Sequence, residues 1–115
     1  MNAVERWQSD LEQHGSLAPA IVDRIISIHG SRGVRAIEAV SELRVKQYRD
    51  FTVVVGHEDE YVIEGRACEC QDAAFNLDKA DPEQLCWHVL AAEIARRIDM
   101  VDDHDMWYSD VREFL

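Results

Sequence analysis

The chain has 115 residues, a length that supports one domain with one modest hydrophobic core and is too short for two. Its net charge of −11, from 23 acidic against 12 basic residues, repels a phosphate backbone and argues against tight autonomous binding to nucleic acid. A hydrophobic fraction of 47% is enough for a packed core and excludes disorder as the reason for the acidic composition.

Three sequence features predict the compartment and the habitat. Residues 1–15 hold neither a basic start followed by an apolar run nor a stretch that spans a bilayer, so we expect a cytoplasmic protein without membrane contact. In a reducing cytoplasm the three cysteines, an odd number, favour metal binding over disulfides. Abundant Asp and Glu with scarce Lys also suit a halophilic organism, whose salt screens charge repulsion beyond about 3 Å.

Three amphipathic helices are predicted in residues 1–43. Gly15 and Gly30 are placed to end the first two helices, Pro19 to begin the second, and residues 31–43 form the third. Apolar residues at helical spacing predict the buried faces: Val4, Trp7 and Leu11; Leu17, Ile21, Ile25 and Ile28; and Val34, Ile37 and Val40.

The pattern changes to β-strands at Phe51. Two short apolar runs, 51–55 and 60–63, joined by the turn 56–59, predict an antiparallel hairpin, and 45–48 is a candidate third strand. A last long helix is predicted near 86–98. The acidic run 101–105 ends it, and residues 106–115 are expected to form one or two further amphipathic helical turns. The apolar face of the helix near 86–98 is Trp87, Leu90, Ile94 and Ile98, opposite Glu93, Arg96 and Arg97.

Two closely spaced pairs of metal-ligand residues flank a 15-residue polar stretch, 71–85. Cys68 and Cys70 continue the second hairpin strand, where residues two apart point to the same face. Cys86 and His88 repeat this spacing at the start of the last helix. Three thiolates and one imidazole form a closed Cys₃His set that suits Zn²⁺ and leaves no position for a reactive water, so we expect a structural zinc site and no catalysis.

The spacing of Cys86 and His88 constrains the last helix. Inside a helix, residues two apart project about 200° apart, so both side chains reach one ion only if Cys86 precedes the helix and His88 lies in its first turn. Residues 81–84 would then form a separate turn. Asp81 and Gln84 also resemble a capping box that favours a longer helix, and the sequence leaves both alternatives open.

These elements predict a single α+β domain, 1–115. It would contain N-terminal helices, a short antiparallel hairpin with a candidate third strand, and a C-terminal helix joined to the hairpin by the zinc site. Its parts are a helical part at 1–43, a zinc-binding part at 44–100 and an acidic, aromatic tail at 101–115.

The order of these motifs resembles the SWIM zinc finger, in which C-x-C leaves a β-hairpin and C-x-H opens a helix after a variable insert. Within that group the chain is most similar to the small SWIM-domain subunits of Shu complexes, which are homologous-recombination mediators. The small size, the helices before the hairpin and Ala91, which completes a C-x-H-x-x-A pattern, carry this similarity. Phe75 looks like the aromatic residue that follows the second cysteine in the family. Both Ala91 and Phe75 are expected to pack at the site.

The resemblance, which covers residues 21–97, implies a non-catalytic subunit from a halophilic archaeon. It would pair with a RecA-family recombinase paralogue in DNA repair, and would meet single-stranded DNA only indirectly or through that partner. A homodimer through an apolar face of the N-terminal helices is an additional expectation. Two rivals remain open: a stand-alone SWIM module that binds DNA or protein in transcription or transposition, and a thiol redox protein using Cys68 and Cys70.

Other clusters are weighed against simpler interpretations. A basic segment could touch phosphates when a partner positions it, or could balance nearby acids; it comprises Arg32, Arg35, Arg44, Lys46 and Arg49. The other histidines and the acidic run 102–105 are assigned no site. Large apolar residues in the tail, which we expect to fold back onto the core rather than to form a docking patch, are Trp107, Tyr108, Phe114 and Leu115.

Overall fold

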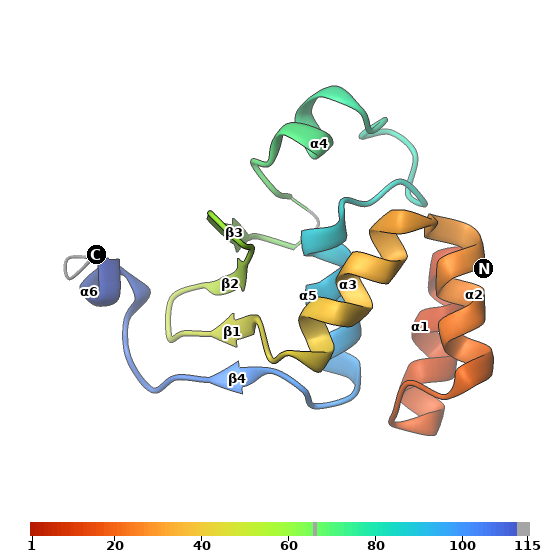
Figure 1. Ribbon diagram of the computed structural model, residues 1–115, viewed down its shortest axis with the longest axis horizontal. Coiled ribbons are helices and arrows are strands. Elements are labelled where there is room, and N and C mark those ends of the chain that lie inside the picture. The colour runs from red at the N-terminus through yellow and green to blue at the C-terminus, as the bar shows by residue number, and fades with distance from the viewer. Residues whose placement is uncertain (66, 113–115) are drawn as a thin grey trace.

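The computed structural model describes residues 1–65 and 67–112, and its α+β architecture is the one the sequence predicts (Figure 1). The N-terminal helices lie at one end of the molecule and α6 (Tyr108–Arg112) at the other, with a small sheet between them. Phe114 and Leu115 lie outside the described residues. No helix in the described part of the chain is both long and apolar enough to cross a membrane.

The three predicted N-terminal helices are confirmed as α1 (Ala3–His14), α2 (Pro19–His29) and α3 (Ser31–Ser41). A capping box begins α1, because the Asn2 side chain accepts a hydrogen bond from the Glu5 amide at 2.8 Å and Glu5 caps the Asn2 amide in return. Gly15 ends α1 in the left-handed region at φ 79°. α1 thus begins and ends at residues that its local chemistry favours, and α2 begins at Pro19 and is followed by Gly30 as predicted.

α3 buries only part of the predicted face. Val34, expected to face the core, is 39% exposed, whereas small residues are buried: Gly33, Ala36 and Ala39, together with Val40. A Cβ at Gly33 would lie 3.1 Å from the Ile25 carbonyl oxygen, so α2 and α3 approach closely there. Val40 and Ile37 pack in or against the core as predicted. The prediction for Val34 was wrong because it weighted apolar size, while close helix packing selects the smallest side chains.

The sheet contains β1 (Val45–Gln47), β2 (Thr52–Val55), β3 (Glu60–Ile63) and β4 (Asp102–Asp103) in the order β3-β2-β1-β4. β2 and β3 form the predicted antiparallel hairpin, with Val53 opposite Val62. β1 pairs antiparallel with β2, which confirms the third strand. β4 was not predicted and pairs parallel with β1, placing Asp102 opposite Lys46.

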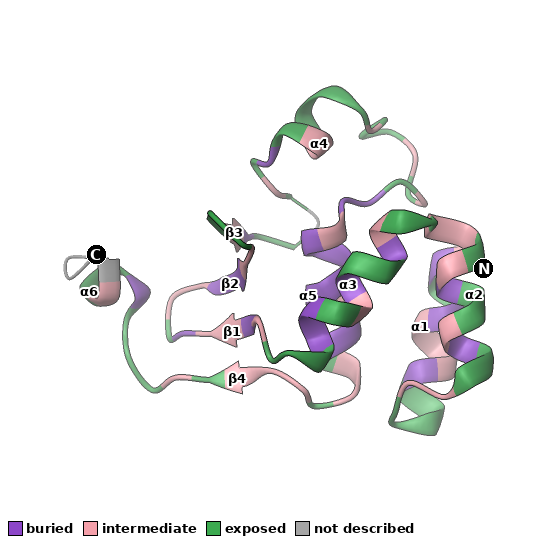
Figure 2. Cartoon of the chain, in the orientation of Figure 1, coloured by how far each residue is buried: buried purple, intermediate pink, exposed green. Residues whose placement is uncertain are grey.

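The core lies between the N-terminal helices and the sheet, and α5 (Trp87–Arg97) runs through it (Figures 1 and 2). Seven of its residues are buried, so α5 is enclosed on more sides than a simple amphipathic stripe predicts.

On the α1 side, the fully buried Trp7 donates a hydrogen bond from Nε1 to His29 Nε2 at 3.1 Å. Burial lowers the pKa of His29 to about 4, so at neutral pH the ring stays a neutral acceptor.

The described part of the tail folds back onto the sheet through a small second core. Tyr108 begins α6 (Tyr108–Arg112), is buried, and donates a hydrogen bond from its hydroxyl to Glu60 at 2.9 Å. Asp50, in the turn after β1, accepts hydrogen bonds from the Tyr108 and Ser109 amides at 2.6 and 3.3 Å. The expected docking of the tail therefore holds for Tyr108, whereas Trp107 stays 48% exposed.

Candidate metal centre

The two ligand pairs meet at one place in the structure. Cys68, Cys70, Cys86 and His88 each offer one ligand atom, and these four atoms all lie within 4.8 Å of one another. With Zn–S bonds of about 2.3 Å, two sulfurs of a tetrahedral site lie about 3.8 Å apart, so a contraction of about 1 Å or less would seat an ion. The cluster can therefore hold a metal ion.

The first pair lies beyond the hairpin strand and does not continue it as predicted. β3 ends at Ile63, and Glu64 and Ala67 form an isolated antiparallel bridge closed by hydrogen bonds of 3.2 and 2.8 Å. The C-x-C segment follows this bridge, which redirects the chain away from the sheet. Cys70 then caps the short helix α4 (Gln71–Phe75), and its Sγ accepts a hydrogen bond from the Ala73 amide at 3.4 Å.

The second pair has the placement that the spacing predicts. Cys86 is the N-cap of α5, with extended backbone at φ −71° and ψ 162°, and His88 lies in the first turn. Residues 81–84 form a separate turn, in which the Gln84 amide donates to the Asp81 carbonyl at 3.2 Å. The longer helix that a capping box would have favoured is therefore excluded, and both side chains face the same centre.

The surroundings of the three thiols favour loss of the proton from one of them, Cys86, even without metal. A hydrogen bond between Cys68 and Cys86 raises the pKa of the Cys68 thiol and, with help from His88, lowers that of Cys86 to about 4. Burial raises the pKa of Cys70. A divalent cation would displace the remaining thiol protons, because thiolates are the ligands.

The His88 ring contacts two aromatic rings, each tilted relative to it. Its centroid lies 4.2 Å from that of Tyr61 on β3 and 3.9 Å from that of Trp87. The side chain is 5% exposed, and its Nδ1 is buried without a hydrogen-bond partner among the described residues. A buried polar atom without a partner is costly, so this nitrogen and the soft sulfur donors fit a metal such as zinc.

An ion pair that sequence reasoning missed lies beside the thiols. Arg32 on α3 makes a two-pronged contact with Asp72 on α4, from Nε at 2.6 Å and Nη2 at 2.8 Å. The hydrogen bond to Asp72 raises the pKa of Arg32, and the nearby Cys86 and Cys70 raise it further. The same contact lowers the pKa of Asp72 to about 2. Arg32 thus connects α4 to α3 and places positive charge next to the thiolates. The only feature of the sequence that indicated this ion pair was Asp72, an acidic residue at the start of a helix that was not predicted.

Replacing Arg32 by alanine is expected to speed the loss of bound metal to a competing chelator by about tenfold. The reason is that residues supporting metal ligands typically contribute 10- to 100-fold to metal affinity, and this pair is partly exposed. Release would be followed with a chromogenic chelator. Arg24→Ala, which removes an α2 surface pair with Asp10, is the matched control and should release metal at the wild-type rate. Equal rates for both variants would contradict the role of Arg32.

The two expected packing residues have different environments. Ala91 is fully buried in α5, one turn after His88. Phe75 ends α4 with 82% of its surface exposed, so it does not pack against the ligands as expected. The short α4 turns that side chain outward, because its inner side is already occupied by Cys70 and by the contact between Asp72 and Arg32.

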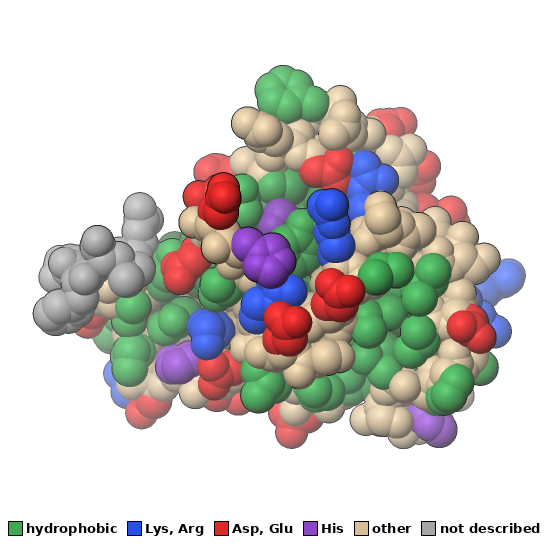
Figure 3. Space-filling model, viewed as in Figure 1, with side chains coloured by type: hydrophobic (Ala, Val, Ile, Leu, Met, Phe, Trp, Pro, Cys, Tyr) green, Lys and Arg blue, Asp and Glu red, His purple; other side chains and the backbone are tan. Residues whose placement is uncertain are grey.

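The basic segment does not form a separate patch. Figure 3 shows Lys and Arg side chains lying among Asp and Glu on the face viewed. Four of the five candidates pair with carboxylates: Arg32 with Asp72, Arg44 with Glu42 at 2.9 Å, Lys46 with Asp102 at 2.7 Å, and Arg49 with Asp105 at 2.7 Å. Arg35 lies near enough to Asp72 to help lower its pKa. The acidic run 102–105 thus supplies partners for Lys46 and Arg49, and phosphate contact by the basic segment stays a prediction.

The fold and the cluster define a small α+β protein with a Cys₃His candidate metal site. No family model and no solved structure matches the chain. Over 86 residues it is 42% identical to an uncharacterized protein of Archaeoglobus fulgidus, and the match covers 75% of this chain and 73% of that protein. The chain therefore belongs to the same family as this archaeal protein.

Proposed function

We propose that the protein binds one structural zinc ion through Cys68, Cys70, Cys86 and His88. The convergence of these four ligand atoms within 4.8 Å carries the proposal. Three sulfurs and one nitrogen complete a tetrahedral shell, so the metal would have no open position at which to activate water. Its task would be to hold the segment after the hairpin, the insert 71–85 and the start of α5 together.

The proposed class is a SWIM-type zinc protein acting as a non-catalytic accessory subunit in homologous recombination and DNA repair. Support comes from the order of the motifs: C-x-C after a β-hairpin, then an insert, then C-x-H at a helix start with the buried Ala91 one turn on. The proposed partner is a RecA-family recombinase paralogue, and single-stranded DNA would be reached through it. The acidic surface supports this indirect route, since the net charge of −11 disfavours phosphate binding by the isolated chain.

Affinity capture from the source organism tests this function. The tagged full-length chain is expected to retain a RecA-family paralogue, whereas a Cys86→Ser chain, lacking one ligand, is expected to lose it. Specific duplex binding by the isolated wild-type protein, with no recombinase captured, would instead indicate a stand-alone DNA-binding module. Rapid alkylation of Cys68 and Cys70 in the metal-loaded protein would point to thiol redox chemistry and would contradict the structural role.

A further inference from the structure

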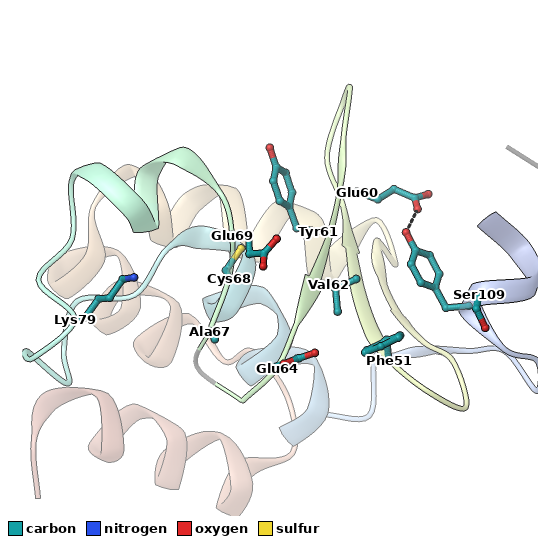
Figure 4. A pocket seen from close by; sticks show the side chains of 11 residues that line it. Phe51, Glu60, Tyr61, Val62, Glu64, Ala67, Cys68, Glu69, Lys79 and Ser109 are labelled. Carbon is teal, nitrogen blue, oxygen red and sulfur yellow. Dashed lines mark hydrogen bonds between the residues drawn. The ribbon is translucent and has the colours of Figure 1, made fainter. Parts of the chain in front are cut away.

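An open groove of about 940 Å³ follows the edge of β3 (Figure 4). β3 is the last strand in the sheet order, so its outer edge pairs with no other strand in the described part of the chain. Figure 4 shows lining side chains on both sides of this strand: Tyr61, Cys68 and Glu69 on one side, and Glu60, Phe51 and Ser109 on the other. The groove therefore wraps the strand edge rather than opening on one face of the sheet.

The edge of β3 offers unpaired backbone groups to this groove. The Gly56 amide donates to the Asp59 carbonyl at 2.7 Å, and hydrogen-bonded pairs alternate along an antiparallel ladder. Tyr61 and Ile63 therefore bond to β2, while Glu60 and Val62 direct their N–H and C=O groups outward. Neither residue makes a backbone hydrogen bond to any described residue outside the hairpin. An extended segment laid along β3 would find both donors and acceptors ready.

The charge of the groove indicates which kind of segment would bind there. Three carboxylates, Glu60, Glu64 and Glu69, line it against one cation, Lys79, so its lining carries a net negative charge. None of the three carboxylates forms an ion pair with a described residue. A second copy of this chain would bring the same carboxylates face to face, and a nucleic acid would add phosphates to them. A basic segment would be attracted. Tyr61 and Val62, both half-buried, supply apolar surface between the charges.

The geometry points to a peptide-docking site in which β3 accepts an extended segment of another protein, with Lys or Arg alternating with apolar residues. Strand side chains alternate between the two faces, so the basic residues would reach Glu60 and Glu64 while the apolar residues would contact the Tyr61 face. Hydrogen bonds to the backbone N–H and C=O groups of Glu60 and Val62 would fix the register of the docked segment against β3. This docking site borders the metal centre, because Cys68 lines the groove and Tyr61 packs against His88, but it does not depend on which complex the protein joins.

Binding of synthetic peptides to the metal-loaded, full-length chain tests the docking site. The probes are capped peptides of about eight residues: one alternating lysine and valine, one alternating glutamate and valine, and a lysine peptide with alternate backbone nitrogens methylated. By fluorescence anisotropy at low salt, the lysine peptide is expected to bind and the glutamate peptide not to bind. Methylation, which removes pairing donors but no charge, is expected to weaken binding at least about fivefold. If the methylated and unmethylated lysine peptides bound equally well, that result alone would overturn strand addition.

Variants of the edge provide the second readout. Val62→Pro removes one outward N–H while keeping the bonds to β2, and is expected to weaken binding about fivefold. Glu60→Gln and Glu64→Gln are each expected to weaken it about two- to fivefold. Glu58→Gln, an equally exposed carboxylate in the hairpin turn outside the groove, is the control and should bind as wild type. Self-association in sedimentation that Val62→Pro abolishes would assign the edge to a second copy and overturn the proposal.

Discussion

Replacing Cys86 by serine is expected to abolish stable metal binding and to unfold much of the chain around the site. Cys86 is 2% exposed, caps α5 and joins the two halves of the cluster. Structural zinc contributes an apparent free energy of about 10–16 kcal/mol, as large as the roughly 5–15 kcal/mol net stability of a domain. Circular dichroism with elemental analysis of the same sample should show loss of helix signal together with loss of metal.

Two controls separate metal loss from a simple packing defect. Glu69→Gln changes a side chain that lies between two ligands but is not itself one, and should keep both the metal and the fold. Chelation of the wild-type protein should reproduce the effect of Cys86→Ser, and added zinc should reverse it. A Cys86→Ser protein that unfolds at the wild-type temperature would contradict a stabilising metal.

Enlarging Ala91 to leucine is expected to destabilise the protein by about 1–3 kcal/mol. Ala91 is fully buried in α5, which packs against α3, a helix whose Ala36 and Ala39 are also fully buried. Three added carbons would force the helices apart or push side chains out of their rotamers. Because His88 lies one turn before Ala91, part of the strain would fall on the metal ligands.

The effect of Ala91→Leu should appear as a lower Tm, by roughly 5–15 °C, in calorimetry of the metal-loaded protein. Ala20→Leu, the same enlargement at an exposed position in the first turn of α2, is the matched control and should leave the Tm nearly unchanged. Equal melting temperatures for the two variants would contradict tight packing of the core around Ala91.

Local patterns were sufficient to predict most of the elements. Gly15, Gly30 and Pro19 mark helix boundaries through backbone chemistry that acts within a few residues, and the β-branched run after Phe51 forms β2 as expected. The position of Cys86 before α5 followed from geometry, because two ligands at that spacing cannot converge inside a helix.

Features that depend on distant contacts could not be predicted. β4 consists of Asp102 and Asp103, which have low strand propensity and pair with β1 because the chain returns there after α5. The contact between Arg32 and Asp72 joins segments 40 residues apart. The burial of Gly33 instead of Val34 depends on the close approach of α2 to α3. In each case the deciding interaction comes from tertiary structure, which the local sequence does not encode.

The metal content of the wild-type protein tests the central claim most directly. The chain would be purified without chelators and measured by elemental analysis and by native mass spectrometry, which gives the stoichiometry of each species. The Cys₃His cluster predicts one zinc ion per chain, retained through gel filtration. A folded protein that carries no metal would contradict the site and, with it, the function proposed for this chain.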